Sequence, residues 1–165
     1  MRTDKFTLKT QEAFEAAQSI MSQYGHQQME GVHLLLGLLQ QEEGIVKQIL
    51  LKLEVDPGKL ANEVRDAVSR LPRVQGAGGG VYVSRELAEI VDLAWKEAER
   101  LKDEFLSTEH ILLGMVARRQ GEAGRILRSY GLSLDRIYQV LVEIRGTQRV
   151  TDQNPEDKYQ DLERY

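Results

Sequence analysis

The chain has 165 residues, 41% hydrophobic and 29% charged, a balance typical of a globular protein and too apolar for a disordered one. Its formal net charge of −4 disfavours nucleic acid and membrane surfaces as main partners, because both attract basic faces. The absence of cysteine excludes disulfides, thiolate metal sites and a cysteine nucleophile. With a charged N-terminal stretch and no apolar run near the roughly 18 residues of a membrane span, we expect a soluble cytoplasmic protein without a signal peptide.

Apolar residues recur at helical intervals through the first half of the chain. The stretch from residue 8 to residue 24 is predicted to be a long amphipathic helix, with Thr7 as its N-cap and Gly25 just beyond its end. Its apolar face is formed by Phe14, Ala17, Ile20, Met21 and Tyr24. The next segment, GVHLLLGLLQQEEG, is apolar nearly all round, which predicts a short buried central helix at residues 31–44.

Two more helices complete this half. IVKQILLKLEV, residues 45–55, is the third predicted helix. Asp56 as N-cap and Pro57 at the first helical position predict the start of a fourth, because proline there loses no hydrogen bond. The apolar stripe of this fourth helix consists of Leu60, Val64, Ala67, Val68 and Leu71.

A connector then interrupts the helical pattern. Pro72 and the glycines of GAGGG cannot continue a helix, and we expect a flexible link at residues 72–83. The glycines do not form a phosphate-binding loop, since no Lys-Ser or Lys-Thr follows them, nor a dinucleotide fingerprint, since a helix rather than a strand precedes them.

After the connector the first half repeats with a constant shift of 77 residues. GVHLLLG at residues 31–37 matches TEHILLG at residues 108–114, and residue types are kept at many other positions without a gap. Among the matched pairs are Thr7 with Ser84, Ala17 with Ala94, Gly44 with Gly121, and Ile49-Leu50 with Ile126-Leu127. A single register over about sixty residues indicates a structural duplication. We therefore predict an all-α fold of eight helices, in two four-helix repeats related by a pseudo-twofold axis.

The repeated heptapeptides carry a histidine and a glycine each. Gly37 and Gly114 would lie inside buried helices, where glycine costs about 1 kcal/mol against alanine, so we expect a neighbouring helix to pack closely there. His33 and His110 do not belong to an HExxH metal motif. We expect each ring to bond a backbone carbonyl across the repeat interface, and assign these four residues a structural role.

The doubled heptapeptide, the 77-residue repeat, the connector RLPRVQGAGGGVYVS and the tail TDQNPEDKYQDLERY together resemble the N-terminal domains of Clp ATPases. The connector and the DQNPEDKY tail resemble the ClpB-type disaggregases more than the protease-linked ClpA and ClpC unfoldases. The resemblance covers essentially the whole chain. It places the domain at 1–145, with repeat one at about 6–71, repeat two at about 84–145, and a polar linker at 146–165 that we expect to be mobile or weakly helical.

The resemblance also implies a function. The domain would be joined to a hexameric AAA+ ring, would bind exposed segments of unfolded or aggregated proteins, and would act with a DnaK-type chaperone system in refolding after stress. No ATP site is present in the chain, so ATP and Mg²⁺ would bind only in other modules, and we expect the domain to be a monomer without cofactor, metal or catalytic residues. Family resemblance places peptide-binding polar residues at Thr7, Asp103 and Glu109, whose structural alternatives are an N-cap, a loop acid and a first-turn acid.

For the apolar walls of a peptide groove we expect Leu93 and Val91, off the core stripe formed by Leu87, Ala94, Ala98 and Leu101. In ClpC relatives both repeats carry the TEH pattern, and its acid helps to read phosphorylated arginine. Here Val32 occupies that place in the first repeat, so a paired phosphoarginine site is not expected. Two alternatives remain open: a domain that docks one folded adaptor, as in ClpC and ClpA, and an enzyme with an inconspicuous acidic site, although no GxSxG elbow is present.

Overall fold

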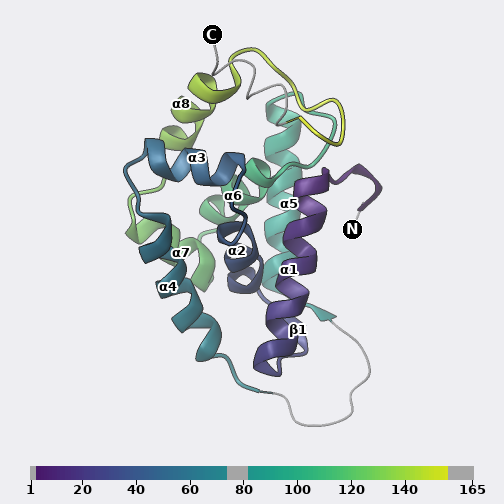
Figure 1. Ribbon diagram of the computed structural model, residues 1–165. Helices are drawn as coiled ribbons and strands as arrows, with labels where there is room; N and C mark the ends of the chain where they lie inside the picture. The colour runs from purple at the N-terminus through teal and green to yellow at the C-terminus, as the bar shows by residue number, and fades with distance from the viewer. Residues whose placement is uncertain (1–2, 74–81, 156–165) are drawn as a thin grey trace.

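The computed structural model describes residues 3–73 and 82–155 (Figure 1), which form eight α-helices in two groups of four. The first repeat contains a 3₁₀ turn, Thr3–Lys5, and then α1(Leu8–Tyr24), β1(Gln28–Met29), α2(Gly31–Leu39), α3(Ile45–Lys52) and α4(Pro57–Ser69). The second contains β2(Tyr82–Val83), α5(Arg85–Arg100), α6(Thr108–Ala117), α7(Glu122–Ser129) and α8(Leu134–Arg145). The all-α double repeat is confirmed, whereas the two short strands were not predicted. Within the described ranges no helix combines the length and apolarity that crossing a membrane requires.

The predicted helix boundaries follow the local chemistry of the chain. The Thr7 hydroxyl accepts a hydrogen bond from the Thr10 N–H at 3.2 Å, and the Ser84 hydroxyl accepts one from the Leu87 N–H at 3.0 Å, so α1 and α5 begin with equivalent caps. Asp56 caps α4 ahead of Pro57. Gly25 closes α1 in the left-handed conformation at φ 70°, which favours glycine.

Helices α2 and α6 occupy the centre of the molecule (Figure 1). Residues 31–38 and 108–116 are buried without a break, as expected from their apolar sequences. A Cβ added at Gly37 would lie 2.7 Å from the Ala13 carbonyl oxygen, and one at Gly114 would lie 2.6 Å from the Ile90 carbonyl oxygen. These glycines therefore allow α2 to pack against α1 and α6 against α5 at backbone contact, which confirms the predicted close approach.

Backbone hydrogen bonds show how the two repeats are joined. The Thr7 N–H donates to the Leu106 carbonyl at 3.0 Å, and the Ser84 N–H donates to the Met29 carbonyl at 2.9 Å. A shift of 77 residues converts 7 into 84 and 29 into 106, so the two bonds are equivalent. In both, the residue before the long helix of one repeat binds the segment before the central helix of the other. The Ser84–Met29 bond belongs to the parallel β1–β2 pair at one end of the interface, and the Thr7–Leu106 bond accompanies the Phe6–Leu106 β-bridge at the other.

The chain after α8 packs onto the domain. The Glu104 N–H donates to the Val150 carbonyl at 2.7 Å, and the Leu8 N–H donates to the Gln153 carbonyl at 2.9 Å. Val150 is fully buried. Contacts with the domain thus extend past the boundary expected at residue 145, as far as Gln153, and no helix forms at residues 146–155. The mobility of the linker stays a prediction. The rest of that linker, and residues 74–81 of the predicted connector, lie outside the described residues.

Candidate functional site

A cluster of titratable side chains is buried where α6, α8 and the α5–α6 loop meet. Arg145 on α8 donates to Asp103 Oδ1 at 2.6 Å and to Glu109 Oε2 at 3.4 Å. His110 Nε2 lies 2.7 Å from Asp103 Oδ2, and the Ser107 hydroxyl donates to Glu109. The carboxylates, the imidazole and the guanidinium are all buried, so each charge depends on the partners inside the cluster.

The ring of His110 has a defined tautomer. Its Nδ1 accepts the Ser107 backbone N–H at 2.8 Å, so the proton of the neutral ring is on Nε2 and is donated to Asp103. Burial alone would raise the pKa of Asp103, but hydrogen bonds from His110, Arg145 and the Val150 N–H outweigh it and lower that pKa to about 2. Asp103 is therefore a stable anion that ties α6, α8 and the C-terminal segment together.

The first repeat uses the same geometry with a different partner. His33 Nδ1 accepts the Glu30 N–H at 2.9 Å, and its Nε2 lies 2.9 Å from Nδ1 of His26, the position that matches Asp103 after the shift of 77. Burial, with a smaller effect of His26, lowers the pKa of His33 to about 4. The expectation that His33 and His110 bond backbone carbonyls across the repeat interface is wrong, because both rings accept a backbone N–H of their own helix start.

The structure places the expected peptide-binding residues mostly inside the molecule. Thr7 caps α1 and is 1% exposed, and Glu109 is fully buried. The Asp103 side chain belongs to the buried cluster, although the residue also lines a surface pocket with Trp95 and Lys96. Val91 is 2% exposed and packs in the core, which contradicts the expectation that it is available on the surface of α5. Leu93 is half-buried.

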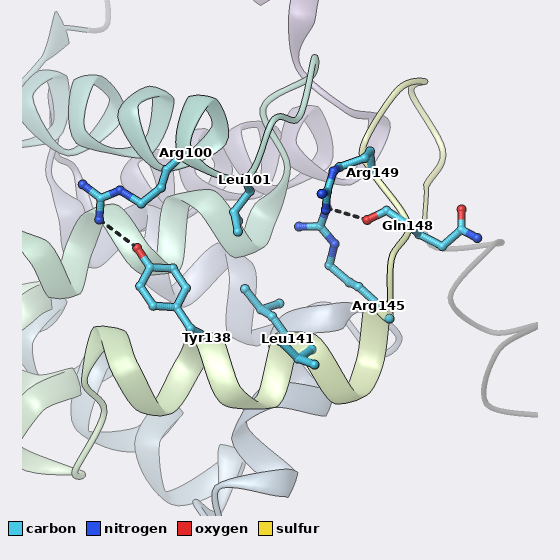
Figure 2. Close-up of a pocket in the computed structure, with 9 residues that line it drawn as sticks. Arg100, Leu101, Tyr138, Leu141, Arg145, Gln148 and Arg149 are labelled. Carbon is cyan, nitrogen blue, oxygen red and sulfur yellow. Dashed lines mark hydrogen bonds between the residues drawn. The ribbon is translucent and has the colours of Figure 1, made fainter.

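The structure shows an apolar groove that the sequence reasoning missed, between the C-terminal end of α5 and α8 (Figure 2). Its volume is about 270 Å³. The lining is formed by Arg100, Leu101, Tyr138, Leu141, Val142, Arg145, Gly146, Gln148 and Arg149, and is called here the α5–α8 groove. Leu101 had been assigned to the core stripe of α5. Val142 is 69% exposed, and its place off the buried stripe of α8 was the available sequence signal.

Cationic and phenolic groups surround the apolar floor of this groove. Arg100 Nη1 donates to the Tyr138 hydroxyl at 3.2 Å, and that hydroxyl donates to Glu97 (Figure 2 shows the Arg100 bond). Burial and the Glu97 carboxylate raise the pKa of Tyr138 to about 12, so the phenol stays neutral. Arg149 is exposed at the opposite rim. The groove therefore combines aliphatic walls with an arginine at each end, of which Arg100 is also paired with Glu97 at 3.4 Å.

A second cavity, of about 300 Å³, lies at the interface of the repeats and is acidic. Val32, the counterpart of Glu109, lines it together with Glu30, Glu86 and Glu122. Burial, and then the charge of Glu86, raises the pKa of Glu30. Arg70 also lines this cavity, and the absence of a paired phosphoarginine site stays a prediction. Over the described residues, no three His, Asp or Glu side chains come together in a way that could hold a metal ion.

Comparison with known proteins identifies the class. Residues 5–130 match the Clp repeat (R) N-terminal domain, and the chain belongs to this family. Over its whole length it is 38% identical to Chaperone protein ClpB of Bacillus cereus and 37% identical to that of Nitratidesulfovibrio vulgaris, of which the matched region is 19% and 20%. The chain thus corresponds to the N-domain of a ClpB-type chaperone and spans about a fifth of the length of these relatives.

Solved structures share the fold. The Hsp104 N-terminal domain from Candida albicans superposes with a TM-score of 0.79 at 20% identity, over 92% of this chain and 99% of that one. The N-domain of ClpV from Vibrio cholerae superposes with a TM-score of 0.70 at 21% identity, over 85% of this chain and 84% of that one. The eight-helix double repeat is therefore shared by N-domains whose sequences have diverged widely.

Proposed function

We propose that this domain captures exposed segments of unfolded or aggregated proteins in the α5–α8 groove and delivers them to the AAA+ ring of a ClpB-type disaggregase. The observation that carries the proposal is the groove itself, an open cavity with an apolar floor. Unfolded chains expose the apolar side chains that folded proteins bury, so an apolar groove distinguishes the two without reading a sequence.

The charges at the groove rim refine the preference. Arg100 and Arg149 are exposed beside aliphatic walls formed by Leu101 and Leu141. A segment with a large apolar side chain and a neighbouring carboxylate complements both features, because the side chain enters the groove and the carboxylate remains at the hydrated rim. Rim pairs of this kind are worth about 1 kcal/mol or less, so binding should be weak and sequence-tolerant.

The polar residues expected to bind peptide take a supporting part in this proposal. Asp103 and Glu109 hold Arg145, whose Nη2 also donates to the Gln148 carbonyl at 3.0 Å (Figure 2). They position the rim of the groove rather than touch the substrate, and Thr7 fixes the adjacent start of α1. Leu93, half-buried on α5, remains a candidate for direct contact.

Within the full-length protein the domain would act as a monomeric module attached to a hexameric ATPase ring in the cytoplasm. ATP and Mg²⁺ would bind in that ring, outside this chain, and the ring would cooperate with a DnaK-type system. The alternative, docking of one folded adaptor protein, predicts the opposite ligand preference and is separated by the following experiment.

The test is an NMR titration of the domain with reduced, carboxymethylated α-lactalbumin, with native α-lactalbumin as the folded control. We expect amide shifts near Leu101, Tyr138 and Val142 with the unfolded form alone. Val142→Asp, at an exposed position, should weaken binding at least threefold, whereas Leu51→Asp, exposed on α3, should not. Preferential binding of the native form would favour docking of a folded partner, whereas equal binding of both forms or no binding of either would refute selective capture of unfolded segments.

A further inference from the structure

The C-terminal segment, residues 148–155, crosses the surface as an irregular peptide that runs without a bend at 148–151 and turns at 152–155. It leaves the α5–α8 groove, whose rim includes Gln148 and Arg149, passes the C-terminal end of α5 and reaches the start of α1 (Figure 1, yellow). No helix or strand is formed along it. The domain therefore holds a piece of polypeptide immediately beside the groove proposed to bind one.

Four hydrogen bonds that hold this segment use its main chain. The Val150 N–H donates to Asp103 Oδ1 at 2.9 Å, and the Val150 carbonyl accepts from the Glu104 N–H at 2.7 Å and from the Phe105 N–H at 3.3 Å. Farther along, the Gln153 carbonyl accepts from the Leu8 N–H at 2.9 Å. Main-chain groups are present in every polypeptide, so these bonds would serve any extended chain of suitable shape.

Side-chain burial in the segment is confined to two positions. Val150 is 0% exposed and Pro155 is buried, whereas Arg149, Thr151, Gln153 and Asn154 are exposed. Val150 places a branched aliphatic side chain in a socket beside the Asp103–Leu106 loop, and main-chain hydrogen bonds surround it. Recognition of this kind requires little of the sequence of the bound peptide. An unfolded segment that contains valine, isoleucine or leucine presents the same groups.

We propose that residues 148–155 are a resident ligand of a peptide site that continues the α5–α8 groove, and that an extended aliphatic segment of an unfolded protein displaces them. This inference rests on the proposed function and adds that a segment of the chain itself competes with the substrate for the site. Asp103 and Arg145 are positioning residues of the site, because Asp103 binds both the arginine and the Val150 N–H. Capture of a substrate would then free the segment that follows the domain.

Binding measurements on the full 165-residue chain test the competition. The substitution Val150→Asp places a carboxylate in the apolar socket next to Asp103 and should release the segment. We expect its affinity for reduced, carboxymethylated α-lactalbumin to rise at least threefold over the unmodified chain. Thr147→Asp adds the same charge at an exposed position just before the segment and should leave the affinity within twofold.

Hydrogen exchange of the unmodified chain gives a second readout that needs no variant. Saturation with the unfolded protein should accelerate exchange of the Val150 amide at least fivefold, because that N–H would lose Asp103. Unchanged protection of Val150 together with clear binding overturns the displacement and leaves the proposed function intact, as does a Val150→Asp affinity equal to that of the unmodified chain. Failure of both chains to bind refutes the proposed function as well.

Discussion

His33 and His110 show how the same residue at the same place acquires different properties in the two repeats. Both rings accept a backbone N–H through Nδ1 and so present Nε2–H to the side chain seven residues earlier. In the second repeat that side chain is the Asp103 carboxylate, and in the first it is the His26 ring. Burial, and then the charge of His26, lowers the pKa of His33, so the first pair resists protonation.

The pH dependence of stability should reveal the His33–His26 pair. The pKa of His33 is about 4 in the folded chain and about 6.5 in a free histidine, so the unfolded chain binds this proton more tightly. Stability from this group is complete above pH 6.5, falls as the pH drops towards 4, and amounts to about 3 kcal/mol over that window. Urea unfolding at a series of pH values measures the slope.

A matched pair of substitutions isolates this contribution from the carboxyl groups that titrate nearby. His33→Gln keeps an acceptor for the Glu30 N–H, because a glutamine at the third position of a helix can accept the N–H of the N-cap residue. Unlike histidine, the glutamine side chain cannot be protonated. We expect it to lose most of the slope between pH 6.5 and 4, while His110→Gln keeps it. An unchanged slope in His33→Gln would show that another group causes the acid sensitivity.

At the scale of elements, the contact of the long helix with the central helix defines each repeat. Gly37 on α2 and Gly114 on α6 face backbone atoms of α1 and α5, at residues that a shift of 77 interconverts. The identity of these glycines follows from the crossing, since any side chain would separate the helices. The glycines in the sequence predicted a close approach of a neighbouring helix, whereas the identity of that helix came from the structure.

The substitution Gly114→Ala tests this crossing. Alanine favours a helix by about 1 kcal/mol, yet its Cβ would lie 2.6 Å from the Ile90 carbonyl oxygen and 3.0 Å from the Ala94 nitrogen, which are backbone atoms that cannot rotate away. Overpacking of this kind costs about 1–3 kcal/mol or more, and we expect a net loss of about 2 kcal/mol in urea unfolding.

The control for this crossing is Gly58→Ala in the first turn of α4. The nearest atom to its added Cβ is Asp56 Oδ1 at 3.4 Å, an ordinary contact, so the variant should be neutral or slightly more stable than the unmodified chain. If Gly114→Ala proves as stable as Gly58→Ala, close backbone approach is not what requires glycine on α6.

At the scale of the whole molecule, the fold was predictable because the two repeats carry the same residue types at equivalent positions. Caps, buried heptapeptides and crossing glycines recur 77 residues apart, and each of these has a local structural meaning. The site was not predictable in this way. The sequence alone did not show that Asp103 and Glu109 are buried, because their partner, Arg145, lies 42 and 36 residues farther along the chain.

The docked C-terminal segment was missed for a related reason. Its composition is polar, and its attachment depends on main-chain atoms and on Val150, which no periodic pattern marks. The α5–α8 groove depends on where α8 ends relative to α5, a property of the packed molecule. Sequence patterns report what each helix buries, whereas surfaces between distant elements require the assembled structure.

The joint between the repeats determines how the molecule unfolds. Each repeat supplies the strand partner of the other, through Ser84 with Met29 and through Thr7 with Leu106, and buried residues of both repeats form one continuous core. Neither half can lose its structure without exposing apolar surface and unpaired backbone groups of the other. We therefore expect one cooperative transition for the domain.

Two probes in one urea titration test this cooperativity. The fluorescence of Trp95, the single tryptophan of the chain, reports α5 in the second repeat, whereas far-ultraviolet circular dichroism reports all the helices. Under a shared transition the two midpoints should agree within about 0.2 M urea, because local loss of one repeat is not populated. If the dichroism signal instead falls in two steps and only one coincides with Trp95, the repeats unfold separately, and the exchanged backbone pairs contribute less than the packing within each four-helix unit.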